Sequence, residues 1–269
     1  MRGSVPFMRL ATWNINSIRA REERALAWLE RTETDVLALQ ETKCTDAQFP
    51  RAAFEAAGYE VATCGYSQWN GVAILSRVGL DDVELGFPGQ PAFGEVPAAE
   101  ARAIGATCGG VRVWSLYVPH GRAPDDPHYA YKLAWLEALR GQAAGWLDAD
   151  RTAQIALVGD WNVAPLDTDV WDVTVFEGGT HVSPPERAAF AAFAAAGYVE
   201  VTRQHLPEER RYTYWDYQQL RFPKNEGLRI DFAYGSPALA ARVTGVTIDR
   251  NERKGKGASD HVPVILGLG

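Results

Sequence analysis

A series of short apolar segments, separated by glycine, proline and polar turns, limits most strongly what this chain can fold into. Each segment has the length and composition of a buried strand, and Gly109-Gly110 between two of them predicts a hairpin. The predicted strands comprise residues 9–13, 35–40, 71–76, 101–107, 111–118, 154–158, 230–234, 243–248 and 262–268. A chain with strands distributed in this way folds around β-sheets.

Helices are predicted between some of these strands. Residues 20–31 are rich in alanine, leucine and tryptophan, and Asp126-Pro127 supplies an N-cap and a first-turn proline for a helix that reaches Trp146. Residues 183–186 (Ser-Pro-Pro-Glu) form a capping box, and Gly197 ends the helix that follows. Because strands outnumber helices and hairpins mix with crossovers, we expect an α/β fold with two mixed sheets packed face to face and helices outside.

Length and composition indicate one large globular domain. The 269 residues are 46% hydrophobic and 23% charged, which is ordinary for a globular protein, and they contain no apolar stretch long enough to span a membrane. We place a single domain at residues 9–269. Residues 1–8 are expected to be an N-terminal extension that lacks the apolar core of a signal peptide; if the native protein begins at Met8, the residues before Met8 are foreign to it.

The cysteines and the charge constrain the environment and the partners. Cys44, Cys64 and Cys108 lack metal-binding spacing, which predicts free thiols and a soluble cytoplasmic protein. The net charge of −7 argues against a protein that coats nucleic acid by bulk attraction. Residues 201–269 are nevertheless basic and can present a local surface for phosphate groups, so the charge leaves the partner open.

Polar residues follow several predicted strands at the point where each strand ends. The segments are residues 13–16 (Trp-Asn-Ile-Asn), 39–43 (Leu-Gln-Glu-Thr-Lys), 159–162 (Gly-Asp-Trp-Asn) and 259–261 (Ser-Asp-His). Taken singly, each also has a structural explanation as an Asx turn, a solvated carboxylate or a hydrogen-bonded histidine. Together with Asp231, which interrupts an apolar strand, they predict a site of oxygen ligands suited to Mg²⁺. Zinc is disfavoured because no histidine and cysteine spacing fits it.

These motifs resemble those of the exonuclease III branch of the endonuclease/exonuclease/phosphatase superfamily, the abasic-site repair endonucleases. Besides the four segments above, the matching motifs are residues 70–75 (Asn-Gly-Val-Ala-Ile-Leu), 117–119 (Tyr-Val-Pro), 212–217 (Tyr-Thr-Tyr-Trp-Asp-Tyr) and 227–231 (Gly-Leu-Arg-Ile-Asp). The resemblance runs through essentially the whole domain. It implies a four-layer α/β sandwich, in which two packed mixed β-sheets are flanked by helices.

The resemblance also implies which residues carry the chemistry. Mg²⁺, with Mn²⁺ as a substitute, is expected at Glu41 as the main ligand, and the implied metal set is completed by Asn14, Asp160, Asn162 and Asp260. The implied catalytic residues are Tyr117, Asp160, Asn162, Asp231 and His261. Asp160 matches the base that activates or orients the attacking water, and His261, oriented by Asp231, matches the phosphate-binding histidine. Stabilising the negative charge on the phosphate oxygens is the task common to these groups.

The substrate-binding set implied by the resemblance comprises Asn16, Lys43, His120, Tyr214, Trp215, Asn225, Leu228, Arg229 and Ile230. Taken alone, residues 212–217 also fit an aromatic core segment, but nearby arginines favour an aromatic platform beside phosphates. Tyr214, Leu228 and Ile230 match a narrow pocket that accepts a flipped, baseless sugar and excludes a normal nucleotide by size.

Two positions depart from the motifs of the family. His120 stands where family members often have asparagine, and it either keeps a phosphate contact with more pH-dependent binding or is a solvated loop residue. Tyr214 stands where relatives carry tryptophan or phenylalanine, so the pocket gains a hydroxyl group. These departures bear on substrate preference and leave the type of reaction unchanged.

The resemblance implies a metal-dependent enzyme of base excision repair that cuts double-stranded DNA 5′ to abasic sites and removes nucleotides or blocking groups from 3′ ends. One alternative is another phosphodiesterase or phosphatase of the superfamily, acting on RNA or phospholipid, in which residues 212–217 and 227–231 are not expected. Another is a non-catalytic nucleic-acid-binding regulator, which has no need of adjacent buried carboxylates. We expect a monomer that does not contact membranes and associates with the nucleoid during repair.

Overall fold

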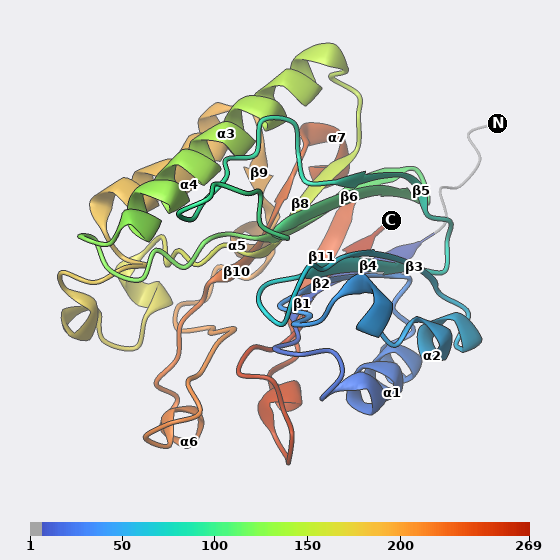
Figure 1. Ribbon diagram of the computed structural model, residues 1–269, viewed down its shortest axis with the longest axis horizontal. Helices are drawn as coiled ribbons and strands as arrows, with labels where there is room; N and C mark the ends of the chain where they lie inside the picture. Colours follow the sequence, from blue (N-terminus) through green and yellow to red (C-terminus); the bar gives the residue numbers. More distant parts are fainter. Residues whose placement is uncertain (1–6) are drawn as a thin grey trace.

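Two β-sheets packed face to face form the centre of the molecule in a computed structural model, which describes residues 7–269. Helices cover the outer face of each sheet, so the chain forms the four layers that were predicted (Figure 1). The expected N-terminal extension lies outside the described residues except for Phe7 and Met8, and Met8 is the first residue of a strand.

The first sheet has six strands in the order β11-β12-β1-β2-β4-β3. They are β11 (Val243–Ile248), β12 (Val264–Leu268), β1 (Met8–Asn14), β2 (Val36–Gln40), β4 (Val72–Ser76) and β3 (Glu60–Cys64). Only the β1–β2 pair among the described strands of this sheet is parallel, and the other neighbours are antiparallel. The sheet is therefore mixed, as predicted.

The second sheet repeats this arrangement, with six strands in the order β5-β6-β7-β8-β10-β9. They are β5 (Asp81–Leu85), β6 (Ala103–Cys108), β7 (Val111–Tyr117), β8 (Ile155–Asp160), β10 (Asp231–Gly235) and β9 (Val199–Glu200). Strands β7 and β8 are parallel, and β10 runs antiparallel to β8. The predicted hairpin at Gly109-Gly110 is confirmed, since Cys108 and Val111 are paired across it.

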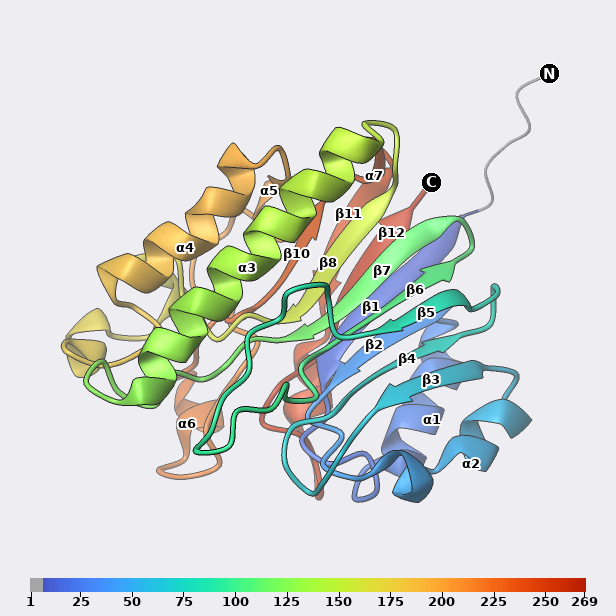
Figure 2. The same ribbon diagram turned by 45° about the horizontal axis from the view of Figure 1, so that its top comes forward.

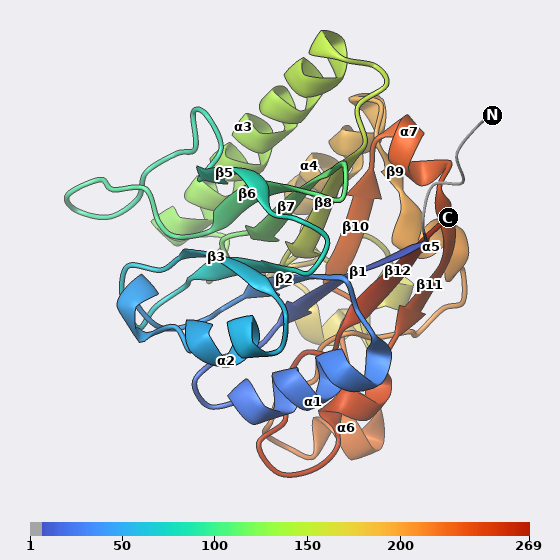
Figure 3. The ribbon, with the colours of Figure 1, turned by 90° about the vertical axis from the view of Figure 1, so that its right-hand side faces the viewer.

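Two pairs of helices form the outer layers. Helices α1 (Glu22–Thr32) and α2 (Arg51–Ala56) cover the first sheet, and α3 (Pro127–Ala149) and α4 (Pro184–Ala195) cover the second (Figure 2 and Figure 3). The predicted caps are confirmed: the Asp126 side chain accepts from the backbone N–H of His128, and Ser183 forms the capping box with Glu186. Shorter helices are α5 (Val201–His205), α6 (Arg221–Lys224), α7 (Pro237–Ala240) and the 3₁₀ turns Asp46–Gln48, Asp167–Asp169, Val173–Phe176 and Arg250–Arg253.

The alternation of side chains along the strands divides the core into layers. Between the sheets lie small and medium apolar side chains, among them Leu10, Val36, Ile74, Val113 and Val158. Large aromatic side chains fill the space between the helices and the sheets: Trp13 of β1 packs with Trp28 of α1, and Trp114 and Trp161 share a second cluster with Trp135 of α3. Cys44, Cys64 and Cys108 are buried free thiols, as predicted. Among the described residues, no helix is both long and apolar enough to cross a lipid bilayer.

Candidate active site

The candidate site is the polar end of the layer between the two sheets. Side chains at every second position of a strand lie on the same face, so Asn14 of β1 faces this layer as Leu10 does. The inward rows of β7 and β8 end in the same way at Tyr117 and Asp160, which are paired across the strands, and Asp231 of β10 is paired with Asp160 from the other side. The pairing of these strands thus places polar side chains from distant parts of the sequence at one end of the two sheets.

Asn14 links the two sheets at this end. Its side-chain amide donates to Glu41 Oε1 at 2.8 Å and to Asp160 Oδ2 at 3.0 Å, and it is fully buried. Atoms of Glu41, Asp160 and His261 suited to a metal ion lie within 4.8 Å of one another. The structure therefore brings together residues that the sequence separates by more than two hundred positions.

The backbone near these side chains adopts conformations that are uncommon for residues with a Cβ atom. Asn16, Glu41, Lys43 and Asn162 have φ angles between 46° and 52°. Such left-handed conformations are unfavourable unless the surroundings enforce them, and they occur often at functional sites. Each of these residues lies within three positions of the end of β1, β2 or β8.

Lys43 compensates the charge of Glu41. Its ammonium group lies 2.7 Å from Glu41 Oε2 and donates to Asn16 Oδ1 at 2.6 Å. Burial alone raises the pKa of Glu41, but Lys43 and the amide of Asn14 outweigh this effect and lower it. Glu41 is therefore an ionised carboxylate at neutral pH, the form in which it can bind a cation.

His261 carries a positive charge at the centre of the site. Its Nδ1 lies 2.9 Å from Asp231 Oδ2, and its Nε2 lies 3.8 Å from Asp160 Oδ2. Burial lowers the pKa of His261, but Asp231 and Asp160 outweigh burial and raise it to about 10. Burial raises the pKa of Asp160 to about 7, with Asp231 and Glu41 adding to this and His261 opposing it. A carboxylate that titrates near neutral pH is suited to act as a general base.

Tyr117 keeps its proton in this environment. Burial raises the pKa of its hydroxyl well above the ordinary value, and the carboxylates of Glu41 and Asp160 raise it further. The guanidinium group of Arg102 lies over the ring, 4.8 Å from its centroid, and pairs with Glu100 at 2.6 Å. Tyr117 is therefore a proton donor held in place from outside the cluster.

The donor set fits a divalent cation that prefers oxygen ligands. A protonated His261 cannot bind a metal ion. The carboxylates of Glu41 and Asp160 are therefore the two residues of the three-residue cluster that can bind one. Burial raises the pKa of Asp160, and the neighbouring carboxylates of Asp231 and Glu41 raise it further against the opposing charge of His261. A bound cation would compensate the negative charge of these carboxylates, so the residues of the site suit a metal ion.

An apolar surface adjoins His261. The ring of Tyr214 packs against the imidazole with centroids 4.9 Å apart, and its backbone is bridged to both Leu228 and His261. Leu228 and Ile230 are buried in one small cluster with Ala164 and Val170, against which Tyr214 packs. The structure thus brings the three predicted slot residues together beside the charged histidine.

Other predicted site residues lie apart from the Glu41–Asp160–His261 cluster. Asp260 accepts from the Asn16 amide at 3.0 Å, so it supports a second layer of the site. Trp215 is fully buried and packs edge-on against Phe222, which matches the core-segment interpretation of its motif. Arg229 is also buried, and it donates to the backbone carbonyl of Leu206. Arg229 precedes β10, and its guanidinium group lies over the ring of Phe232, 5.5 Å from the centroid.

Asn225 is exposed at the end of α6, where it accepts from Arg250 at 3.3 Å. It is therefore a surface residue outside the charged cluster.

His120 forms a hydrogen-bonded chain with a residue that the sequence did not single out. His120 Nδ1 accepts from the backbone N–H of Arg122, which leaves its Nε2–H to donate to His181 Nε2 at 3.2 Å. His181 Nδ1 then donates to the carbonyl of Asn162 at 2.6 Å. Burial and the cation of Lys132 lower the pKa of His181, in agreement with a neutral ring. No local pattern marks His181, which lies in an irregular loop.

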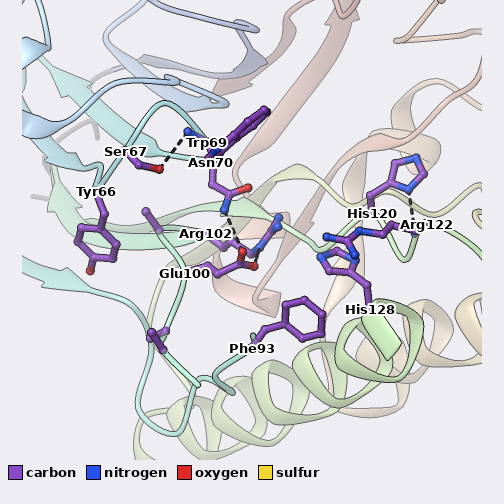
Figure 4. Close-up of a pocket in the computed structure, with 13 residues that line it drawn as sticks. Tyr66, Ser67, Trp69, Asn70, Phe93, Glu100, Arg102, His120, Arg122 and His128 are labelled. Atoms are coloured by element: carbon purple, nitrogen blue, oxygen red, sulfur yellow. Dashed lines mark hydrogen bonds and ion pairs between the residues drawn. The ribbon is translucent and has the colours of Figure 1, made fainter. Parts of the chain in front are cut away.

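A pocket of about 590 Å³, lined by both aromatic and polar side chains, lies beside Glu100 and Arg102 (Figure 4). Its wall includes Asn70, Glu100 and Arg102, and Asn70 donates to Glu100 at 3.2 Å while its backbone carbonyl accepts from the N–H of Lys43. These contacts connect the loop of Lys43 in the first sheet to Tyr117 in the second. Asn70 belongs to one of the matched motifs, whereas Glu100 and Arg102 were not predicted.

Comparisons with known proteins agree with this geometry. An exodeoxyribonuclease from Bacillus subtilis is 31% identical over 268 residues, covering 96% of this chain and 98% of the relative. A structure of the 3′ phosphatase NExo from Neisseria, bound to a product DNA hairpin, superposes with a TM-score of 0.91 at 34% identity, covering 97% of this chain and 99% of that one. An AP endonuclease from Archaeoglobus fulgidus gives 0.89 at 33% identity, with the same coverage.

Two packed sheets that end in carboxylates, amides and a charged histidine define a hydrolase of the four-layer α/β sandwich class. The sequence profile of the endonuclease/exonuclease/phosphatase family matches residues 11–261. The chain belongs to this family, and the resemblance noted in its sequence is confirmed.

Proposed function

We propose that the protein is a magnesium-dependent phosphodiesterase of DNA repair. It cuts double-stranded DNA 5′ to abasic sites and removes nucleotides or blocking groups from damaged 3′ ends. The observation that carries the proposal is the convergence of Glu41, Asp160 and the His261–Asp231 pair at one end of the two sheets. The named activities of relatives over nearly the whole chain, nuclease and 3′ phosphatase, support the same conclusion.

In the proposed reaction, Asp160 takes a proton from the attacking water. Its pKa of about 7 suits this role, and Asn162, whose backbone N–H donates to Asp160 Oδ1 at 2.9 Å, helps to orient the water. His261 donates to a phosphate oxygen and stabilises the charge that develops there, with Asp231 fixing its ring. Tyr117, which keeps its proton, is placed to donate to the leaving oxygen.

Mg²⁺, with Mn²⁺ as a substitute, would be held by Glu41 and Asp160. The other proposed ligands are Asn14, Asn162 and Asp260. When bound, the cation supplies positive charge that stabilises the phosphate oxygens in the transition state. With the charge of Glu41 compensated by the cation, Lys43 would be free to contact the DNA backbone. Asn16, which accepts a hydrogen bond from Lys43, would be free to do the same.

Tyr214, Leu228 and Ile230 are proposed to recognise the damage. An apolar slot beside His261 fits a sugar without a base and offers few groups that could hydrogen-bond a base edge. Recognition then depends on shape and on the ease of flipping, with no fixed sequence. Duplex DNA is the proposed partner of a monomeric enzyme that acts in the cytoplasm at the nucleoid.

The test is an end-labelled duplex with one tetrahydrofuran abasic analogue, incubated with Mg²⁺, with Mn²⁺ and with EDTA. We expect a nick 5′ to the analogue with either metal and none with EDTA, and release of phosphate from a matched duplex with a 3′-phosphate end. The Asp160→Asn variant serves as the control for contaminating nucleases. Binding without nicking would instead identify a regulator, and hydrolysis of RNA or a phosphoinositide in preference to both duplexes would identify another phosphodiesterase.

A further inference from the structure

A fully buried ion pair lies behind the catalytic residues. Lys132 of α3 and Glu186 of α4 are both 0% exposed, and their charged groups are in direct contact. Lys132 stands within the apolar stripe of its helix, where Tyr131, Trp135 and Leu136 pack on the second sheet. An aliphatic side chain at this position would continue that packing, so the lysine needs a separate explanation.

The ammonium group of Lys132 holds the backbone of two catalytic loops. Its Nζ donates to the carbonyl of Asn162 at 2.7 Å and to the carbonyl of His120 at 3.2 Å. Asn162 follows the end of β8 in a left-handed conformation, and His120 follows the end of β7. Lys132 thus fixes the segments that leave the two strands carrying Asp160 and Tyr117.

Glu186 holds a third segment against the same cation. Its Oε1 accepts from the hydroxyl of Thr180 at 2.5 Å and from the backbone N–H of His181 at 3.0 Å. The single hydroxyl hydrogen of Thr180 is directed to the Glu186 carboxylate, and the same Oγ1 lies 2.9 Å from the carbonyl oxygen of His120. The pair therefore joins residues 118–122, 160–164 and 180–183, the first two through Lys132 and the third through Glu186.

Stability alone is a poor explanation for such a pair. Removing two charges from water is costly, and apolar replacements of buried ion pairs are often neutral or stabilising. What an apolar pair cannot supply is a donor for two carbonyl groups at once. The contacts that only Lys132 can make are those with the carbonyls of Asn162 and His120.

We propose that Lys132, held by Glu186, is a positioning residue for phosphodiester hydrolysis. Through its hydrogen bonds to the backbone, Lys132 fixes the position of Asn162 and Asp160 relative to Tyr117 without touching the substrate. This inference rests on the proposed function for its kinetic consequences, whereas its structural consequence, ordering of the loops 118–122 and 160–164, is independent of it.

The test removes both charges together. In the double variant Lys132→Met/Glu186→Gln, no unpaired charge stays buried, and the amide oxygen keeps an acceptor for Thr180 and His181, whereas the oxygen that accepts from Ser183 is replaced by an amide nitrogen. We expect thermal unfolding close to that of the wild type, kcat for abasic-site incision lower by roughly 10- to 100-fold, and KM nearly unchanged. The single variant Lys132→Met, which leaves Glu186 unpaired, is expected to lose the same activity and also stability.

The matched control is Arg77→Met. Arg77 also pairs with a carboxylate, Asp35, at 2.9 Å and donates to the backbone carbonyl of Glu33, but it lies at the opposite end of β2 from Glu41. We expect its kcat to equal that of the wild type. Assays are run at a temperature at which circular dichroism shows every variant to be folded.

Hydrogen–deuterium exchange provides a measurement that needs no catalysis. The backbone amides of residues 118–122 and 160–164 should exchange faster in the double variant than in the wild type. Their exchange rates in Arg77→Met should equal those of the wild type. Unchanged exchange of both loops, or a folded double variant that keeps wild-type kcat, would overturn the proposal and make the pair a packing feature. Loss of incision in the wild type itself would refute the proposed function, and faster exchange in these loops would still support the positioning role.

Discussion

The two ends of the layer between the sheets are built from the same strands and have opposite character. At one end the inward side chains are apolar and fully buried, among them Leu10, Val36, Val113, Ala156 and Leu266. At the other end the same rows finish in Asn14, Gln40, Tyr117, Asp160 and Asp231, and charged groups lie within contact distance. Buried charges and left-handed backbone at the polar end are unfavourable for folding. The apolar packing at the other end offsets this cost.

The largest effect is expected from the polar end. Asp160→Asn keeps the shape of the side chain and removes the proposed base, so kcat for incision should fall by roughly 10²–10⁴-fold. Affinity for abasic DNA, measured by fluorescence anisotropy in EDTA, should be unchanged or higher because a negative charge near phosphate is lost. A variant that keeps more than about a tenth of the wild-type rate would show that Asp160 is not the base.

Leu10→Ala makes the reciprocal change at the apolar end. Leu10 is fully buried, so truncating it should lower the free energy of unfolding by about 2–5 kcal/mol in urea titrations. The kcat of the folded variant should remain that of the wild type. A selective loss of kcat without loss of stability would mean that the two ends are not separable in this way.

Substitutions in the His261–Asp231 pair test whether these two residues of the polar end act as one unit. His261→Ala and Asp231→Asn should each cost about 2.7 kcal/mol or more in transition-state stabilisation, calculated from kcat/KM. The double variant should lose little more than the worse single variant, because Asp231 acts through the ring that it holds at 2.9 Å. Simple addition of the two losses would show that they work independently.

Leu228→Ala addresses the apolar slot beside the charged cluster. Loss of apolar contact with a baseless sugar is worth roughly 1–3 kcal/mol, so kcat/KM for abasic-site incision should fall by about tenfold or more. Release of a 3′-phosphate, which needs little from the slot, should change much less. Both assays are made at one salt concentration. Equal losses would mean that Leu228 supports the whole site structurally.

The smallest effect is expected in the pH dependence of stability. The pKa of His261 is raised from 6.5 to about 10 in the folded protein, so its pairing stabilises the fold fully below pH 6.5 and is lost as the pH rises towards 10. Asp231→Asn removes the strongest raising partner, and NMR titration should show a lower imidazole pKa. The difference in Tm from the wild type should be largest below pH 6.5 and shrink in alkali. A difference independent of pH would contradict this assignment.

Much of the fold was predictable from local pattern. The predicted strands and three predicted helices are present, because apolar runs and caps are encoded by neighbouring residues. Strand β5 (Asp81–Leu85) was missed because three of its five residues are carboxylates, and all five are exposed at the edge of the sheet. Strand β3 at the edge of the first sheet was missed too, since its sequence is mixed in character.

The site was predictable in part. Motifs at strand ends indicated Asn14, Glu41, Asp160 and His261, and these residues do converge. Trp215 and Arg229, from the motifs at residues 212–217 and 227–231, instead lie buried away from the cluster, because side-chain direction depends on packing. The fit of each predicted role to catalysis stays a prediction until the variants are measured.

The sequence by itself determined which segments become strands, where the helices begin, and that carboxylates and amides follow the strand ends. These properties depend on side-chain periodicity and capping, which act over a few residues. Only the tertiary structure decided that Asn14 bridges the sheets, that His261 is charged, and that Lys132 holds the loops of Asn162 and His120. Distance and desolvation set those properties, and both arise only when chain segments far apart in sequence pack together.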